Sequence, residues 1–180
     1  MKVNARPERG LLKAISVLKE QLKRLDAHER ELFNRCVEFL ERGDELSQVK
    51  AMLYAEECAE VRKILKTVLM VEYALRRVLL RLEAVEEPVD LMIQGAVAVQ
   101  VLSVLRKRLG GMLPEVGYEL DKAAEMLGRL VTEIAESKGL MVPFESKEVE
   151  KILRWSEAEA EQDLSGRPEI PKPKKTSVGV

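Results

Sequence analysis

Residues 11–44, LLKAISVLKEQLKRLDAHERELFNRCVEFLERGD, carry an apolar pattern that decides the fold. Apolar side chains recur at alternating steps of four and three residues, and one polar residue, Glu29, occupies a position in the series. The apolar members are Leu11, Ile15, Leu18, Leu22, Leu25, Leu32, Cys36 and Phe39. Because this spacing aligns one face of a helix with a neighbouring helix, it predicts a coiled-coil seam over four heptads.

A second helix is expected directly after the dipeptide Gly43-Asp44, since Gly suits the end of one helix and Asp caps the next. It should run from about Glu45 to Glu87, and it repeats the same alternation at Ile64, Val68, Val71, Leu75, Val78, Leu82 and Val85. Such a helix would be about 65 Å long. A compact globule of this chain length is only about 40 Å across. The sequence therefore predicts an elongated antiparallel hairpin.

Proline and aspartate mark the start of a third helix. Pro88 is expected to end the second helix, and Asp90 to cap a third that reaches about Leu109. Residues 91–105, LMIQGAVAVQVLSVL, are apolar on nearly every side of this helix, which predicts that it is buried. The same run is too short to span a bilayer, so we expect no integral membrane helix.

Glycines separate the remaining elements. Gly110-Gly111 is a candidate hinge before a fourth helix over residues 114–137. A linker over 138–145 and an acidic fifth helix over 146–164 follow.

The expected fold class is all-α, a long antiparallel helical hairpin with additional packed helices. Three parts are expected along the chain. They are a helical core over residues 1–138, a linker with the fifth helix over 139–165, and a disordered Pro-rich tail over 166–180.

Few residues suited to catalysis or to metal binding are present. The chain has two cysteines and one histidine, and His28 stands in no Glu-x-x-His pair of the kind that a di-metal helical bundle requires. No glycine-rich loop of a nucleotide site occurs, and Glu56-Glu57 is typical of ion-pair partners on a polar helix turn. We therefore expect no enzyme activity, metal, cofactor or small-molecule substrate. The N-terminus lacks the apolar core of a secretory signal, which favours a cytoplasmic location.

Charge is unevenly distributed along the chain. Residues 1–111 contain 20 Lys and Arg and 17 Asp and Glu, a net charge of +3. Residues 112–165 contain 6 and 13, a net charge of −7, and residues 166–180 contain 4 and 1, a net charge of +3. A basic front half followed by an acidic segment indicates an anionic partner and an internal competitor for it, although solvated helix faces alone would also explain the pattern.

Basic residues of the first helix lie off the apolar seam, namely Lys13, Lys19, Lys23, Arg24 and Arg30. A rigid rod with such an exposed side can attract an anionic membrane surface. Nucleic acid is disfavoured because no aromatic residues are interleaved among the charges. A plain solvated face remains the alternative, since acidic residues also occur along this helix.

The tail contains a Pro-rich motif around one aliphatic residue, formed by Arg167, Pro168, Ile170, Pro171 and Pro173. Such a segment is already extended in a polyproline-like conformation before it binds. Docking it in a groove therefore costs less conformational entropy. A low-complexity chain end is the alternative, but a solvating tail does not need an apolar anchor such as Ile170.

The ordered set of these features resembles the ESCRT-III fold, and in particular the archaeal cell-division protein B (CdvB) group. The resemblance covers roughly residues 8–175. It begins with the basic helix at Leu11–Ile15, LLKAI, and is closest at residues 54–60, YAEECAE, followed by Arg62-Lys63. The third and fourth helices, the acidic fifth helix and the Pro-rich tail follow in the same order.

This resemblance implies a membrane-remodelling subunit that polymerises with copies of itself or with paralogues, in archaeal cell division or vesicle budding. It also implies that the fifth helix folds back on the hairpin and keeps the subunit closed. The Pro-rich motif would bind the MIT domain of an AAA ATPase that disassembles the polymer. We expect a shorter paralogue without the C-terminal winged-helix module that some members use to bind division protein A.

Two rival interpretations follow from the residues. One is a soluble coiled-coil adaptor whose hairpin binds partner helices and never meets a membrane. The other is a helical-bundle enzyme with carboxylate chemistry, for which the sequence supplies no ligand set.

Overall fold

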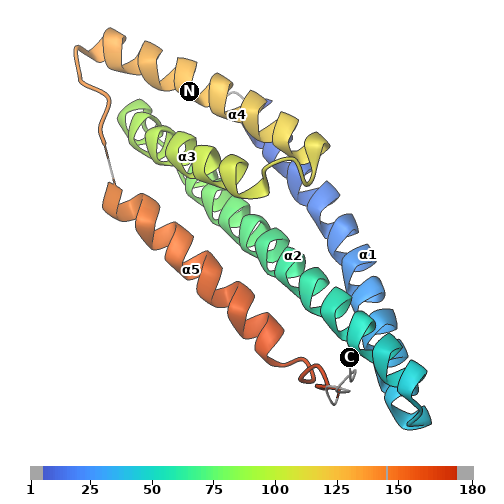
Figure 1. The fold of residues 1–180 in the computed structure, drawn as a ribbon. Coiled ribbons are helices and arrows are strands. Elements are labelled where there is room, and N and C mark those ends of the chain that lie inside the picture. The colour runs from blue at the N-terminus through green and yellow to red at the C-terminus, as the bar shows by residue number, and fades with distance from the viewer. Residues whose placement is uncertain (1–5, 145, 174–180) are drawn as a thin grey trace.

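The computed structural model describes residues 6–144 and 146–173, and these form five α-helices joined by short connections (Figure 1). No strand occurs within these two ranges. The helices are α1 (Arg6–Arg42), α2 (Glu45–Glu83), α3 (Pro88–Leu109), α4 (Pro114–Lys138) and α5 (Ser146–Ser165). The all-α prediction is confirmed.

α1 and α2 form the expected long hairpin, whose tip projects beyond the other helices in Figure 1. The turn uses Gly43 at φ 76°, a left-handed conformation that glycine adopts without strain. Asp44 is the N-cap of α2 and accepts hydrogen bonds from the Ser47 backbone N–H (3.1 Å) and hydroxyl (2.6 Å). These hydrogen bonds lower the pKa of the Asp44 carboxyl, because they favour its charged form. The predicted turn and its cap are confirmed.

The predicted boundary between the second and third helices is wrong. α2 ends at Glu83, and Pro88 is the first residue of α3 rather than the terminator of α2. The residue before a proline is driven into extended geometry, and Glu87 has φ −107° and ψ 148° as the N-cap of α3. Proline lacks the N–H that would be unsatisfied at a helix start, so it fits the first position. Asp90 consequently lies in the first turn of α3 and is not its cap.

α3 is the central helix of the core, as its apolar composition predicts. It packs against α4, α2 and α5, and its buried side chains include Leu91, Val101 and Leu105. By length and composition α3 could cross a membrane, but half of its most apolar 18-residue window is buried inside the protein. That burial is what a core helix shows.

α3 and α4 approach each other closely where Gly95 faces α4. A Cβ atom at Gly95 would lie 2.6 Å from Cγ2 of Val131, well inside van der Waals contact. The missing side chain therefore permits the close packing of these two helices.

The turn between α3 and α4 lies at the candidate hinge. Gly110 ends α3 with φ 54°, and its N–H donates to the backbone oxygens of Arg106 and Lys107. Whether Gly110-Gly111 acts as a hinge stays a prediction.

α5 lies alongside α2 and α3 as a separate rod (Figure 1). It is reached through residues 139–144, an extended linker on the surface. Gly139 caps α4 in left-handed geometry, at φ 65°. The observed bounds of α4 and α5 lie within one residue of those predicted.

Candidate functional site

The C-terminal segment docks on the helical hairpin, and this interface is the candidate functional site. α5 presents Val149, Ile152 and Ala160 to the core, where each is less than one-tenth exposed. Ser156 is also buried on this face, and its hydroxyl donates to the backbone oxygen of Ile152 (2.7 Å), so no polar group is left unsatisfied there. The apolar stripe holds α5 in place, and the polar contacts surround it.

Ion pairs join the acidic side of α5 to basic residues of α2 and α3. Arg81 of α2 donates to Glu148 at 2.6 Å. The other pairs are Lys66–Glu161 (2.8 Å) and Arg108–Glu157 (3.7 Å). The acidic segment and the basic front half of the chain therefore meet directly.

These contacts change the titration of two groups. The hydrogen bond and positive charge of Arg81 lower the pKa of the Glu148 carboxyl. Tyr73 of α2 donates a hydrogen bond to Asp163 of α5. This bond raises the pKa of the Tyr73 hydroxyl to about 12, because it stabilises the protonated form, and burial and the negative charge of Asp163 add to the effect.

Trp155, the single tryptophan of the chain, marks the middle of this interface. The Arg77 guanidinium lies over its indole ring, 4.1 Å from the ring centroid. The ring of Tyr73 meets it edge to face, with centroids 6.1 Å apart. The indole therefore contacts two side chains of α2 while α5 is docked.

The tail continues beyond α5 onto the hairpin, although residues 166–173 were expected to be disordered. Arg167 donates to Oε2 of Glu29 at 2.8 Å and also pairs with Asp26. Glu29 is only 3% exposed, and its other oxygen accepts from Nε of Arg62 at 2.8 Å. Two charge-assisted hydrogen bonds and burial give the tail a defined course, which composition does not reveal. Residues 174–180 of the expected tail lie outside the described residues.

Ile170 completes the docking of the tail. Together with Leu164 it packs against a buried cluster of the hairpin formed by Leu32, Cys58, Val61 and Leu65. Pro168 is exposed, whereas Pro171 and Pro173 are partly buried. The structure therefore places two of the predicted motif residues, Arg167 and Ile170, against the same chain.

The two cysteines are buried on the inner side of the hairpin, and neither forms a disulfide. Burial raises the pKa of the Cys58 thiol to about 11, and the nearby Glu29 carboxylate adds to this effect. A thiol with so high a pKa is a poor nucleophile at neutral pH. Within residues 6–144 and 146–173, no three His, Cys, Asp or Glu side chains are grouped so that they could hold a metal ion.

The predicted anion-binding residues of α1 are all exposed, but they differ in their partners. Lys13 pairs with Glu119 of α4 at 3.2 Å, and Arg30 pairs with Asp26 one turn earlier at 3.3 Å. Lys19, Lys23 and Arg24 form no ion pair with any other described residue. The charges of Lys19, Lys23 and Arg24 are therefore the most available to an anionic partner.

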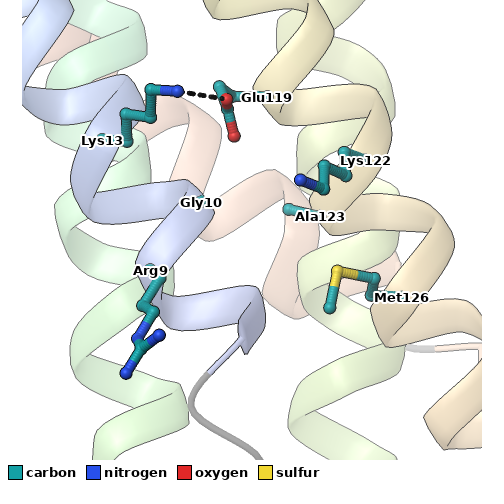
Figure 2. Close-up of a pocket in the computed structure, with 7 residues that line it drawn as sticks. All are labelled: Arg9, Gly10, Lys13, Glu119, Lys122, Ala123 and Met126. Carbon is teal, nitrogen blue, oxygen red and sulfur yellow. Dashed lines mark ion pairs between the residues drawn. The ribbon is translucent and has the colours of Figure 1, made fainter.

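A groove between α1 and α4 brings together residues that sequence analysis did not connect (Figure 2). Its volume is about 400 Å³, and its lining residues are Arg9, Gly10, Lys13, Glu119, Lys122, Ala123 and Met126. Lys122 was not singled out from the sequence, because only the packing of α4 on α1 places it beside Arg9 and Lys13. No one-dimensional pattern indicates that packing.

Comparison with curated proteins gives relatives named for cell division, two of them from the same archaeon. The chain is 34% identical over 160 residues to "Cell division protein B1" of Sulfolobus acidocaldarius, which covers 87% of this chain and 73% of that protein. It is 27% identical over 160 residues to "Cell division protein B" of the same organism, covering 87% of this chain and 60% of that protein.

No family model and no solved structure matches the chain. The first identity extends over nearly the whole chain and nearly three-quarters of the relative, and the helical architecture agrees with it. The chain therefore belongs to the cell division protein B family, whose ESCRT-III-like helical bundle it adopts.

Proposed function

We propose that this protein is a non-enzymatic, self-assembling subunit that remodels membranes in archaeal cell division. The relatives named for cell division support the process. The observation that carries the mechanism is the docking of acidic α5 on the basic side of α2 and α3, together with the docking of the tail on the α1–α2 hairpin. In this proposal the described conformation is a closed, resting subunit.

Release of α5 would expose a surface suited to assembly. The apolar positions of α2 and α3 that now contact Val149 and Ile152 would meet water, which favours their burial against another copy. Lys66, Arg81 and Arg108 would lose their acidic partners at the same time. A neighbouring subunit or paralogue with an acidic surface would replace both kinds of contact.

The Pro-rich motif is proposed to bind the MIT domain of an AAA ATPase that disassembles the polymer. Arg167 and Ile170 are the residues we expect to matter most, joined by Pro168, Pro171 and Pro173. Because the hairpin holds Arg167 and Ile170 in the closed subunit, the motif would become fully accessible only after the tail is released.

The exposed basic side of α1 is proposed to bind anionic membranes. The protein would then be cytoplasmic and peripheral at the inner face of the membrane, at the division site. Many weakly basic subunits on one membrane would bind with an avidity that a single subunit lacks.

A soluble coiled-coil adaptor is the second candidate, and one observation favours it. Acidic and basic side chains alternate along the exposed side of α1, where a shallow depression is lined by Lys23, Asp26, Arg30, Glu31, Arg35 and Glu38. Such a mixed surface attracts anionic lipid weakly.

The deciding experiment mixes purified protein with anionic liposomes and images the product by negative-stain electron microscopy. Full-length protein is compared with protein truncated after Lys138 and with the charge reversal Arg81→Glu. Filaments or coated tubes that increase in both variants would support a closed, membrane-remodelling subunit. The double variant Arg81→Glu/Glu148→Arg restores the pair and should return assembly toward the full-length level. Absence of both sedimentation and polymers in every variant would favour the adaptor.

A further inference from the structure

The groove between α1 and α4 is basic at its rim and carries one buried carboxylate at its centre. We propose that it is a binding site for a phosphate group, presented either by free phosphate or by a lipid headgroup. The lipid form of this inference rests on the proposed membrane function, whereas the free-phosphate form does not.

Glu119 is the fixed element of the site. Its side chain is only 6% exposed and pairs with Lys13 at 3.2 Å. Gly10 faces it across the groove: a Cβ there would lie 3.4 Å from Oε2 of Glu119, at ordinary van der Waals distance. A buried carboxylate needs a partner, so Glu119 holds the Lys13 ammonium at the edge of the groove.

Lys13 remains available to a ligand despite this ion pair. Its side chain is 62% exposed. An ammonium group has three N–H donors, so donors remain after Glu119 is satisfied. Glu119 thus positions Lys13 and does not fully occupy it.

Two further cations flank the groove and have no ion-pair partner among the residues that the structure describes. Arg9 comes from the first turn of α1 and is exposed, as is Lys122 of α4. Figure 2 shows the Lys122 ammonium and the Met126 side chain turned toward the gap between the two helices. Three cations and one carboxylate give the lining a net charge of +2, which matches a phosphate dianion.

The small residues Gly10 and Ala123 leave the space in which the anion would lie. Arginine and lysine donors together suit phosphate, since guanidinium binds it in a two-pronged manner and ammonium as a point charge. Because the cations come from two helices, the site exists only while α4 packs on α1. A bound phosphate would therefore stabilise that packing by mass action.

The first test uses full-length protein and inorganic phosphate. Thermal unfolding is followed at constant ionic strength with phosphate replacing chloride, and affinity is measured by titration calorimetry. We expect phosphate to raise the melting temperature, and Lys122→Ala to weaken binding about fivefold, as expected for the loss of one near-surface charge. Lys107→Ala removes an exposed charge from α3 outside the groove and should leave affinity unchanged. The proposed site would be contradicted if the protein bound no phosphate. It would also be contradicted if Lys122→Ala and Lys107→Ala lost phosphate affinity equally.

The second test separates the two sources of the phosphate group. Vesicles of phosphatidylcholine with and without phosphatidic acid are sedimented with wild type, Lys122→Ala and Lys107→Ala. Weaker binding by Lys122→Ala alone would identify the headgroup as the ligand. Lys122-dependent binding of inorganic phosphate without any vesicle binding would support the free-phosphate site and count against the membrane function. Vesicle binding that Lys122→Ala does not change, together with no binding of inorganic phosphate, would contradict the proposed site. That result would still be compatible with the membrane function.

Discussion

Arg167 in the tail donates from Nη1 to Oε2 of Glu29 at 2.8 Å, across 138 residues of sequence. Glu29 is the one polar residue in the apolar seam of α1, and it is almost completely buried. Arg62 of α2 donates to the opposite carboxylate oxygen at 2.8 Å. One carboxylate therefore joins α1, α2 and the tail, and the interruption of the seam coincides with the place where the C-terminal segment docks.

Replacing Arg167 with Ala should release the tail while leaving the hairpin intact. Glu29 would keep Arg62, so we expect a loss of about 1–3 kcal/mol in the free energy of unfolding, as for other charge-assisted hydrogen bonds. Limited proteolysis and hydrogen exchange should show faster cleavage and exchange over residues 164–173. Lys172→Ala, at an exposed position of the same tail, is the matched control. Equal protection in wild type and Arg167→Ala would show that the ion pair does not hold the tail.

Acid should undock α5, and Trp155 reports on it. Arg81 lowers the pKa of Glu148 in the folded protein below its ordinary value of 4.5. The contribution of this pair to the docking free energy of α5 is therefore present above about pH 4.5. It is lost as the pH falls through the lowered pKa of Glu148. Fluorescence of Trp155, which contacts Arg77 and Tyr73 only when α5 is docked, should stay constant near neutrality and change below that pH.

The control for acid undocking is Arg81→Gln, which removes the partner of Glu148. In this variant Glu148 no longer has a lowered pKa, so its protonation no longer weakens docking. The α5 interface should already be weaker at neutral pH, and the part of the Trp155 acid transition that depends on Glu148 should be lost. High salt should act in the same direction, since Arg81 and Glu148 are each more than one-quarter exposed and are screened. A Trp155 signal that is identical in both proteins at every pH would contradict the role of this pair.

The hairpin, its turn and the order of the helices were predictable because each depends on local information. The seam of α1 has a regular period, and Gly43-Asp44 has the chemistry of a helix end followed by a cap. The boundary at Pro88 was predicted wrongly because proline can either end one helix or begin the next, and sequence alone does not decide between them.

The candidate site was only partly predictable, because its contacts are long-range. The charge asymmetry indicated an internal acidic competitor, and α5 indeed meets α2 and α3. The individual pairs, such as Lys66–Glu161, depend on the register of helices that are far apart in sequence. The docking of Arg167 on Glu29 left one trace in the sequence, a polar residue in an apolar seam, but nothing indicated its partner.

Charge reversal on α1 should weaken membrane binding if this side of the helix meets lipid. The triple variant Lys19→Glu, Lys23→Glu and Arg24→Glu changes exposed residues, so folding should be preserved. With about 1 kcal/mol for each near-surface charge, we expect sedimentation with anionic vesicles to weaken by more than tenfold. Reversal of Lys107, Arg129 and Lys138, which are exposed on α3 and α4, matches the change in net charge. An equal loss in both triple variants would indicate a general charge effect.

If the tail binds an MIT domain as proposed, Ile170→Asp should abolish that binding. A charged side chain cannot fill an apolar pocket without a large desolvation penalty. Titration calorimetry with the isolated MIT domain measures the affinity, and Ile170→Val should retain most of it. The same substitution also removes the contact of Ile170 with the hairpin cluster, which would make the tail more accessible. Unchanged affinity of Ile170→Asp would therefore argue strongly against the assigned motif.

Gly95→Ala should destabilise the core, because the new methyl group would lie 2.6 Å from Cγ2 of Val131. Neither helix can shift without disturbing the packing of α3 against its other neighbours, so we expect a loss of about 1–3 kcal/mol in the free energy of unfolding. Gly128→Ala on α4 is the matched control. A Cβ there meets nothing within 4 Å, and the substitution should stabilise the helix by about 0.5–1 kcal/mol.

The double variant Gly95→Ala/Val131→Ala tests whether this contact is the cause. It removes the methyl group that clashes, so chemical denaturation should find the double variant more stable than the sum of the two single changes predicts. Additive losses would mean that the two residues act independently. In that case the close approach of α3 and α4 at Gly95 would not be what requires glycine at this position.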